Sequence, residues 1–164
     1  MSDQAFTPEE IAELRNLLEI EKIRKVKLLY SQLMDSRDID ALADIFAEDA
    51  ICEFGPYGTW HGQDEIRANY HQVFKDAAPY DGIHATTNQW VELTSPTTAV
   101  SRTYLIDVSH EANPRVNPVV WYGLYDEDYE KIDGAWKVKR CSLQFLWPER
   151  LVNEGWPGPF PPAS

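Results

Sequence analysis

The sequence predicts an α+β domain in which helices come first and an antiparallel sheet follows. Apolar residues recur at helical spacing in three segments of the first half. From Gly82 onward the pattern changes to β-rich runs that are separated by turn residues. A strongly bent sheet wrapped over the longest helix would leave a conical cavity between the two layers.

The first helix is predicted to begin after Thr7 and to end near Asp35. Thr7 can cap the helix, Pro8 stands where a missing N–H costs nothing, and Glu10 completes a capping box. Apolar residues then follow at intervals typical of one helix face as far as Leu33.

A short second helix, a strand pair and a third helix complete the first half. Asp38 is a candidate cap for the second helix, and residues 50–54 and 59–61 are expected to form a strand and its return. The third helix is predicted to open at residues 62–65 and to stop at 77–79, where a proline follows two alanines.

Four long strands are expected after the helices, over residues 84–93, 99–108, 119–129 and 136–146. The pair Asp133-Gly134 predicts a short hairpin between the last two. We expect one domain over residues 1–147. An irregular arm should follow over residues 148–164, because its many prolines cannot donate to a sheet ladder.

Charge and composition exclude several classes of protein. The chain has 15 Lys+Arg against 27 Asp+Glu, a net charge of −12, which disfavours nucleic acid and anionic membrane surfaces as partners. No apolar run is long enough to span a bilayer, and the first residues lack the blocks of a signal peptide. Cys52 and Cys141 have no metal-ligand spacing. We therefore expect a cytoplasmic protein with free thiols.

Aromatic content and missing motifs narrow the function. Aromatic residues make up 12% of the chain, more than a core of this size needs, so they are candidates for a pocket wall or a subunit interface. The sequence has no phosphate-binding glycine loop, no Cys-x-x-Cys or His-Glu-x-x-His motif and no nucleophilic-serine motif. We expect neither a metal nor a cofactor.

The remaining candidates for chemistry are His, Asp and Tyr side chains. Strand alternation places His84, Asn88 and Trp90 on one face, where a histidine facing a cavity could exchange protons. Asp35 ends the first helix, and as a structural residue it would be a terminal cap. Asp107 interrupts an apolar strand, so it either reaches solvent or is buried with a partner.

Other aromatic and acidic residues have structural interpretations. Tyr30 is a core aromatic on the helix by default, and Trp121, Tyr122 and Tyr125 are expected to pack in the sheet, with some facing any cavity. The acidic run at residues 126–128 is interpreted as a solvated strand end.

The chain resembles the SnoaL-like branch of the nuclear-transport-factor-two-like superfamily over residues 19–146. Similar members are scytalone dehydratase, bile-acid 7α-dehydratase and hexachlorocyclohexane dehydrochlorinase. The resemblance rests on residues 29–35 (LYSQLMD), 43–50 (ADIFAEDA), 61–62, 83–84 with Asn88, and 125–138.

The resemblance implies a cystatin-like, cone-shaped barrel with an enclosed hydrophobic pocket and no cofactor. His84 would be the general base and Asp35 its orienting carboxylate. Tyr30 and Asp107 match pocket residues of the bile-acid enzyme, and Tyr30 or Asn88 could hydrogen-bond a developing oxygen. Tyr30 and Asp35 are five residues apart, about 140° around a helix, and so share a wall only if the helix end is irregular or the pocket wraps that end.

The chain also departs from its relatives. Tyr30 stands where the dehydrochlorinase has a lysine, and Cys141 and Phe145 stand where relatives place arginines, which argues against an anionic substrate. His110 is a candidate for the second histidine of scytalone dehydratase.

Three functions follow from these observations. The first is a cofactor-independent lyase that dehydrates a small neutral aromatic or polycyclic substrate, or releases formaldehyde from a diaryl diol by a retro-aldol step. The second is a ketosteroid-isomerase-like or cyclase enzyme that depends on Asp107. The third is a non-catalytic binding or assembly module. The resemblance also implies a homo-oligomer, with a trimer favoured, and the segment at residues 156–160 is a candidate interface or lid.

Overall fold

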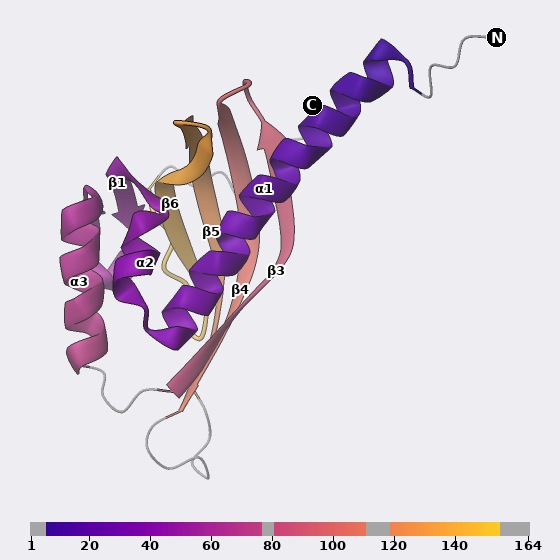
Figure 1. The fold of residues 1–164 in the computed structure, drawn as a ribbon. Helices are drawn as coiled ribbons and strands as arrows, with labels where there is room; N and C mark the ends of the chain where they lie inside the picture. Colours follow the sequence, from indigo (N-terminus) through magenta and orange to yellow (C-terminus); the bar gives the residue numbers. More distant parts are fainter. Residues whose placement is uncertain (1–5, 77–80, 111–118, 155–164) are drawn as a thin grey trace.

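The computed structural model describes residues 6–76, 81–110 and 119–154 (Figure 1). In chain order the elements are α1 (Pro8–Ser36), α2 (Ile39–Asp44), β1 (Phe46–Glu53), the 3-10 helix η1 (Gly55–Tyr57), β2 (Thr59–His61), α3 (Gln63–Asp76), β3 (Asp81–Leu93), β4 (Thr98–His110), β5 (Val119–Ile132) and β6 (Ala135–Trp147). The predicted α+β class and the order of its elements are confirmed.

The six strands form one mixed sheet in the order β2-β1-β6-β5-β4-β3. All neighbours are antiparallel except β1 and β6, which are parallel. The sheet is open, with β2 and β3 at its two edges, rather than a closed barrel. Helix α1 crosses one face of the sheet, while α2 and α3 lie beside β1 (Figure 1).

Local sequence signals set the helix ends as predicted. The Thr7 side chain accepts a hydrogen bond from the Glu10 N–H, and the Glu10 carboxylate accepts one from the Thr7 N–H. At the other end Arg37 adopts a left-handed conformation with φ 59°, and the Asp38 side chain then caps α2.

Strand β1 begins earlier than the sequence predicts. Helical spacing assigns Phe46 to the second helix, and the strand was expected only over residues 50–54. In the structure Phe46 pairs with Val138 of β6, and the Val138 N–H donates to the Ile45 carbonyl. Tertiary pairing thus overrides the local helical pattern here. The predicted hairpin is present between β5 and β6, with positive φ at both Asp133 and Gly134.

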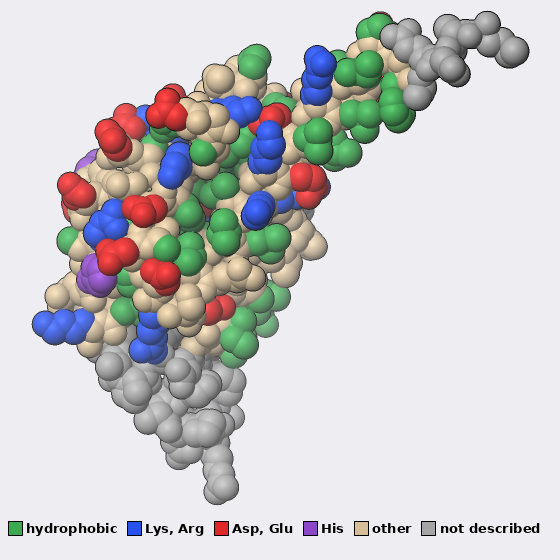
Figure 2. Space-filling model, in the orientation of Figure 1, with side chains coloured by type: hydrophobic (Ala, Val, Ile, Leu, Met, Phe, Trp, Pro, Cys, Tyr) green, Lys and Arg blue, Asp and Glu red, His purple; other side chains and the backbone are tan. Residues whose placement is uncertain are grey.

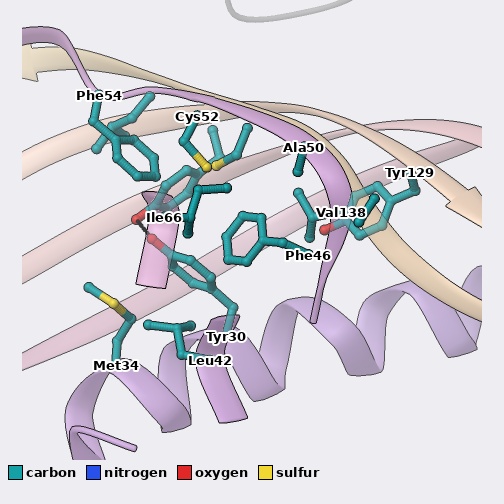
Figure 3. Close-up of a cluster of buried hydrophobic side chains, with 14 of the residues drawn as sticks. Tyr30, Met34, Leu42, Phe46, Ala50, Cys52, Phe54, Ile66, Tyr129 and Val138 are labelled. Atoms are coloured by element: carbon teal, nitrogen blue, oxygen red, sulfur yellow. Dashed lines mark hydrogen bonds between the residues drawn. The ribbon is translucent and has the colours of Figure 1, made fainter. Parts of the chain in front are cut away.

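The hydrophobic core lies between α1, α2, α3 and the inner face of the sheet (Figure 3). Ile23, Leu42 and Ile66 are fully buried there, and Tyr30 packs edge-on against Phe46. Burial of these side chains fixes how α1 lies on the sheet, and this in turn sets the positions of Tyr30 and Asp35.

The described part of the C-terminal arm folds back onto β6. Leu151 pairs with Phe145, and the Asn153 side chain donates to Ser142 Oγ and to the Glu53 carbonyl. The segment at residues 156–160 lies outside the described residues. Within the described ranges no helix is both long and apolar enough to cross a membrane.

Candidate active site

A cavity of about 470 Å³ lies between the helices and the inner face of the sheet. Its volume is within the range of sites that hold a small organic molecule. Five of the residues predicted for a site line it, namely Tyr30, His84, Asp107, Trp121 and Tyr125. The remainder of the described wall is mainly apolar and aromatic, including Phe54, Trp60, Tyr70, Leu105, Leu143 and Phe145.

His84 and Asp35 are in direct contact at the edge of this cavity. Asp35 Oδ1 lies 2.7 Å from His84 Nδ1 and also accepts the backbone N–H of His84 at 3.0 Å. Because a carboxylate only accepts hydrogen bonds, Nδ1 carries a proton, and in the neutral imidazole Nε2 is left with a lone pair. The histidine can therefore take up a proton at Nε2, and the imidazolium that results is balanced by Asp35.

Asp35 contacts His84 from outside the cavity wall, although it lies about 140° around the helix from Tyr30. Asp35 is in the last turn of α1, and its side chain is 30% exposed, whereas that of His84 is 9% exposed. Asp35 is not part of the cavity wall and contacts His84 on its Nδ1 side. The wall therefore does not need to include both Tyr30 and Asp35.

Asp107 faces His84 across the β3–β4 ladder. The two residues are paired in register, and Asp107 Oδ2 lies 4.0 Å from His84 Nε2. This is beyond hydrogen-bond length but within ion-pair range. The Asp107 side chain is 17% exposed and lines the cavity, so it is a partly buried acid with a partner rather than a solvated strand end.

Three tyrosine hydroxyls meet in the cavity wall. Tyr30 Oη lies 3.1 Å from Tyr70 Oη, and the Tyr125 hydroxyl donates to Tyr30 Oη at 3.4 Å. Figure 3 shows the Tyr30 hydroxyl directed toward a second phenol from α3. Burial raises the pKa of all three phenols well above the ordinary value for tyrosine, so they stay protonated and available as donors.

Asn88 and Trp90 do not lie in the cavity wall, contrary to the strand-alternation prediction. The ladder between β3 and β4 shifts register between Thr87 and Trp90, and Asn88 has φ 53°. This irregularity moves the inward positions by one residue, so that Val91 is buried in the core and Asn88 is exposed.

A buried ion pair behind the tyrosines was missed by the sequence analysis. Lys27 Nζ lies 2.7 Å from Glu127 Oε1, with side chains only 2% and 1% exposed. The Lys27 ammonium stands 3.2 Å from the centre of the Tyr125 ring and 4.3 Å from that of Tyr30. Tyr129 donates to the second Glu127 oxygen at 3.1 Å.

The interpretation of residues 126–128 as a solvated strand end is therefore wrong for Glu127. Strand alternation from Tyr125 to Tyr129 places Glu127 on the inner face, and Lys27 lies on the buried face of α1 with Ile23 and Tyr30. A charged residue at the same periodic position as core residues was the signal that could have revealed the pair.

Other expectations have mixed outcomes. Tyr70 of α3 lines the cavity although it was not among the predicted site residues. Tyr122, by contrast, is 45% exposed. The His110 side chain lies outside the described residues. Among the residues that the structure describes, no group of three His, Cys, Asp or Glu side chains could hold a metal ion.

The chain belongs to the SnoaL-like domain family, which it matches over residues 15–142. The matched range covers most of the helices and the sheet, and it contains nearly all of the residues that line the cavity. The predicted family is thus confirmed, and solved structures of similar fold are described as cystatin-like.

Three solved structures illustrate the similarity. A protein named as a candidate scytalone dehydratase from Novosphingobium aromaticivorans is 23% identical, with 85% of this chain and 95% of that chain covered and a TM-score of 0.74. LinA is 19% identical, with 92% and 99% covered and a TM-score of 0.74. A candidate aromatic ring hydroxylase from N. aromaticivorans is 28% identical, with 77% and 87% covered and a TM-score of 0.66.

Proposed function

We propose that this protein is a cofactor-independent lyase in which His84 is the general base and Asp35 holds it in place. The observation that carries the proposal is the 2.7 Å contact between Asp35 and His84 Nδ1, which leaves Nε2 as the proton acceptor beside an aromatic cavity. Similarity in fold to a candidate scytalone dehydratase and to LinA supports a small-molecule-processing enzyme.

The substrate class that suits this cavity is a small, neutral aromatic or polycyclic compound. None of the described wall residues is Lys or Arg, and Phe145 lies in the wall where the resemblance places an arginine. An anionic substrate would have no counter-charge there and would face the carboxylate of Asp107. Aromatic side chains such as Trp121 and Phe54 offer ring faces and edges to a planar substrate.

The reaction is an elimination. His84 Nε2 removes the proton from the carbon next to the leaving group, a double bond forms between the two carbons, and hydroxide departs. The leaving hydroxide takes that proton from the His84 imidazolium and leaves as water, while the Tyr30 phenol, which stays protonated, is a candidate hydrogen-bond donor to the departing oxygen. In the retro-aldol variant, His84 removes a hydroxyl proton instead, and formaldehyde is released as the carbon–carbon bond breaks. The bonding electron pair stays on the other carbon, which takes the proton back from the His84 imidazolium.

Asp107 supports a second candidate, an isomerase or cyclase of the same fold. It stands on a strand, lines the cavity and lies 4.0 Å from His84 Nε2, so it could itself move a proton between two carbons. In that case Asp107 would be indispensable and Asp35 would not. A non-catalytic binding module is the third candidate, and it would need neither acid–base residue.

A homotrimer is the proposed assembly. The outer face of the sheet carries Tyr122 and Trp147, which are 45% and 54% exposed and contact each other with their rings tilted by 51°. The exposed Ile106 is paired with Tyr122. A cluster of this kind on an open sheet suits a subunit contact. The molar mass in solution, measured by light scattering, tests it: a single-copy mass would overturn the trimer.

The test of the reaction is a screen without added cofactor. Aromatic and steroid-like alcohols, diols and ketones are incubated with wild type, Asp35→Asn or Asp107→Asn. The products are separated by chromatography, and their masses are measured by mass spectrometry. A lyase gives a product lighter by its leaving group, which is lost in Asp35→Asn. A product of unchanged mass that is lost only in Asp107→Asn supports the isomerase. Tight binding without turnover supports the binding module.

A further inference from the structure

The first half of α1 extends beyond the sheet with almost no cover (Figure 1). Every residue from Phe6 to Leu18 is exposed except Ile11, which is partly buried. The next residue, Glu19, makes the first contacts with the sheet, to Lys131 and Trp136. A helix segment of about 12 residues is marginal in water on its own, so packing against a partner would stabilise it.

The exposed side chains of this segment form an apolar stripe. Leu14, Leu17 and Leu18 are 42%, 50% and 61% exposed, and Phe6 and Leu28 are 51% and 59% exposed. Figure 2 shows hydrophobic side chains gathered over the projecting end of the helix. At 100° per residue the four leucines lie on the side of α1 roughly opposite the buried residues Ile23, Lys27 and Tyr30. Phe6 precedes the helix and lines one shallow surface hollow together with Leu14 and Leu17.

Charge is distributed unevenly along α1. Glu9, Glu10 and Glu13 lie near its start, whereas past its middle Lys22 and Arg24 pair with Glu19 and Glu21 of the same helix, and Lys25 has no such pair. Lys25 and Glu9 have no ion-pair partner among the residues that the structure describes. An antiparallel copy of the same helix would therefore bring the acidic start of each helix beside Lys25 of the other.

We propose that α1 is an interface that pairs with α1 of a second copy of this chain, antiparallel and about a two-fold axis beside Leu17 and Leu18. Glu10 and Lys25 lie equally far from this midpoint, about 11 Å on either side at 1.5 Å per residue. Glu10 of one copy therefore meets Lys25 of the other.

The apolar side chains are also arranged symmetrically about this two-fold axis. Phe6 and Leu28 lie almost equally far on either side of the Leu17–Leu18 midpoint, and both face the exposed stripe. In the paired helices Phe6 of one copy packs on Leu28 of the other, outside the charged contact. The self-complementary pattern favours a second copy over an unrelated partner.

A two-fold contact joins copies in pairs, independently of any subunit contact made by the outer face of the sheet. If the sheet forms trimers, pairing of α1 gives assemblies of six copies, and without trimers it gives dimers. Disruption of α1 therefore halves the number of copies in either case, and this outcome is independent of whether the proposed reaction is correct.

The first experiment measures molar mass by light scattering for wild type, Leu17→Glu/Leu18→Glu and the control Val152→Glu, which changes an exposed apolar residue away from α1 and from the outer face of the sheet. The double variant should have half the wild-type mass and the control the full mass. The same number of copies in the double variant as in wild type would overturn the proposal. Glu10→Gln keeps a capping box but removes the charge, and should weaken pairing about two- to fivefold.

The second experiment tests the antiparallel register by disulfide trapping. Cys52 and Cys141 are fully buried and do not compete with introduced thiols. A mixture of the Phe6→Cys and Leu28→Cys variants should form the mixed disulfide under mild oxidation. A disulfide between two Leu28→Cys chains instead would show a parallel pair and overturn the register, and absence of any cross-link would overturn the contact.

Discussion

Asp35 Oδ1 accepts both the ring Nδ1–H and the backbone N–H of His84, at 2.7 and 3.0 Å. One carboxylate oxygen thus fixes the orientation of the imidazole and ties the last turn of α1 to the edge strand β3. The same contact sets the tautomer, because Nδ1 must donate and Nε2 must then accept. The same carboxylate oxygen therefore both positions the base and holds the end of α1 on the sheet.

The first prediction concerns this double contact. In Asp35→Asn the amide oxygen can still accept the backbone N–H, but the negative charge that balances the imidazolium is lost. We expect product formation to fall by about 10²- to 10⁴-fold, the contribution typical of acid–base catalysis, with little change in the melting temperature. Steady-state kinetics on a substrate from the screen measures it, with Asp38→Asn, which retains an acceptor at the α2 cap, as the control. Equal rates in both variants would contradict the role of Asp35.

The second prediction concerns the buried ion pair. Lys27→Met leaves Glu127 charged and buried without its counter-charge, and we expect a loss of about 3–5 kcal/mol in the free energy of unfolding. Lys27→Met/Glu127→Gln should recover much of this loss, because no net charge is then buried. Urea unfolding at neutral pH measures both variants.

The matched control for the ion pair is Lys22→Met, which breaks the exposed pair with Glu19 and should cost no more than about 1 kcal/mol. A similar loss for Lys22→Met and Lys27→Met would mean that burial of the Lys27–Glu127 pair has no energetic consequence.

The third prediction concerns the tyrosine cluster. Tyr30→Phe removes the hydroxyl that Tyr70 and Tyr125 share, and leaves two buried phenols short of a partner. We expect a loss of about 1–3 kcal/mol in stability. Tyr57→Phe, at an exposed position of the cavity wall, should cost close to nothing. If both variants unfold at the same urea concentration, the hydroxyl cluster does not stabilise the fold.

The fourth prediction is a pH dependence set by Glu19. Hydrogen bonds from Lys131, Lys22 and Trp136 lower its pKa from 4.5 to about 2. In the folded protein Glu19 therefore stays ionised at acidities where the unfolded chain binds a proton. Its contribution is complete above pH 4.5 and is lost as the pH falls toward 2. Denaturant unfolding at pH 6, 4 and 3 should show a smaller decline for Glu19→Gln than for wild type, and identical declines would contradict the assignment.

Local signals in the sequence were sufficient for the helices and for much of the site. The capping box at Thr7, the cap at Asp38 and the hairpin at Asp133 depend on neighbouring residues alone, and each is present in the structure. His84 and Asp35 were candidates from local pattern alone, but pairing the two needed the family resemblance, because their contact joins residues 49 positions apart.

The features that the sequence could not predict depend on irregular backbone or on distant pairing. One register shift in β3 turns Asn88 outward, and nothing in the local alternation marks where that shift occurs. The burial of Lys27 with Glu127 is another case, since each charge is tolerated only because a partner 100 residues away meets it.

The most direct test of the proposed function is the rate of product formation by His84→Ala, compared with His71→Ala. His71 is an exposed histidine on α3, outside the described cavity wall, so its removal controls for loss of an imidazole as such. With both variants shown to be folded by circular dichroism, we predict a loss of about 10²- to 10⁴-fold for His84→Ala and a wild-type rate for His71→Ala. A wild-type rate for His84→Ala would contradict the assignment of His84 as the general base.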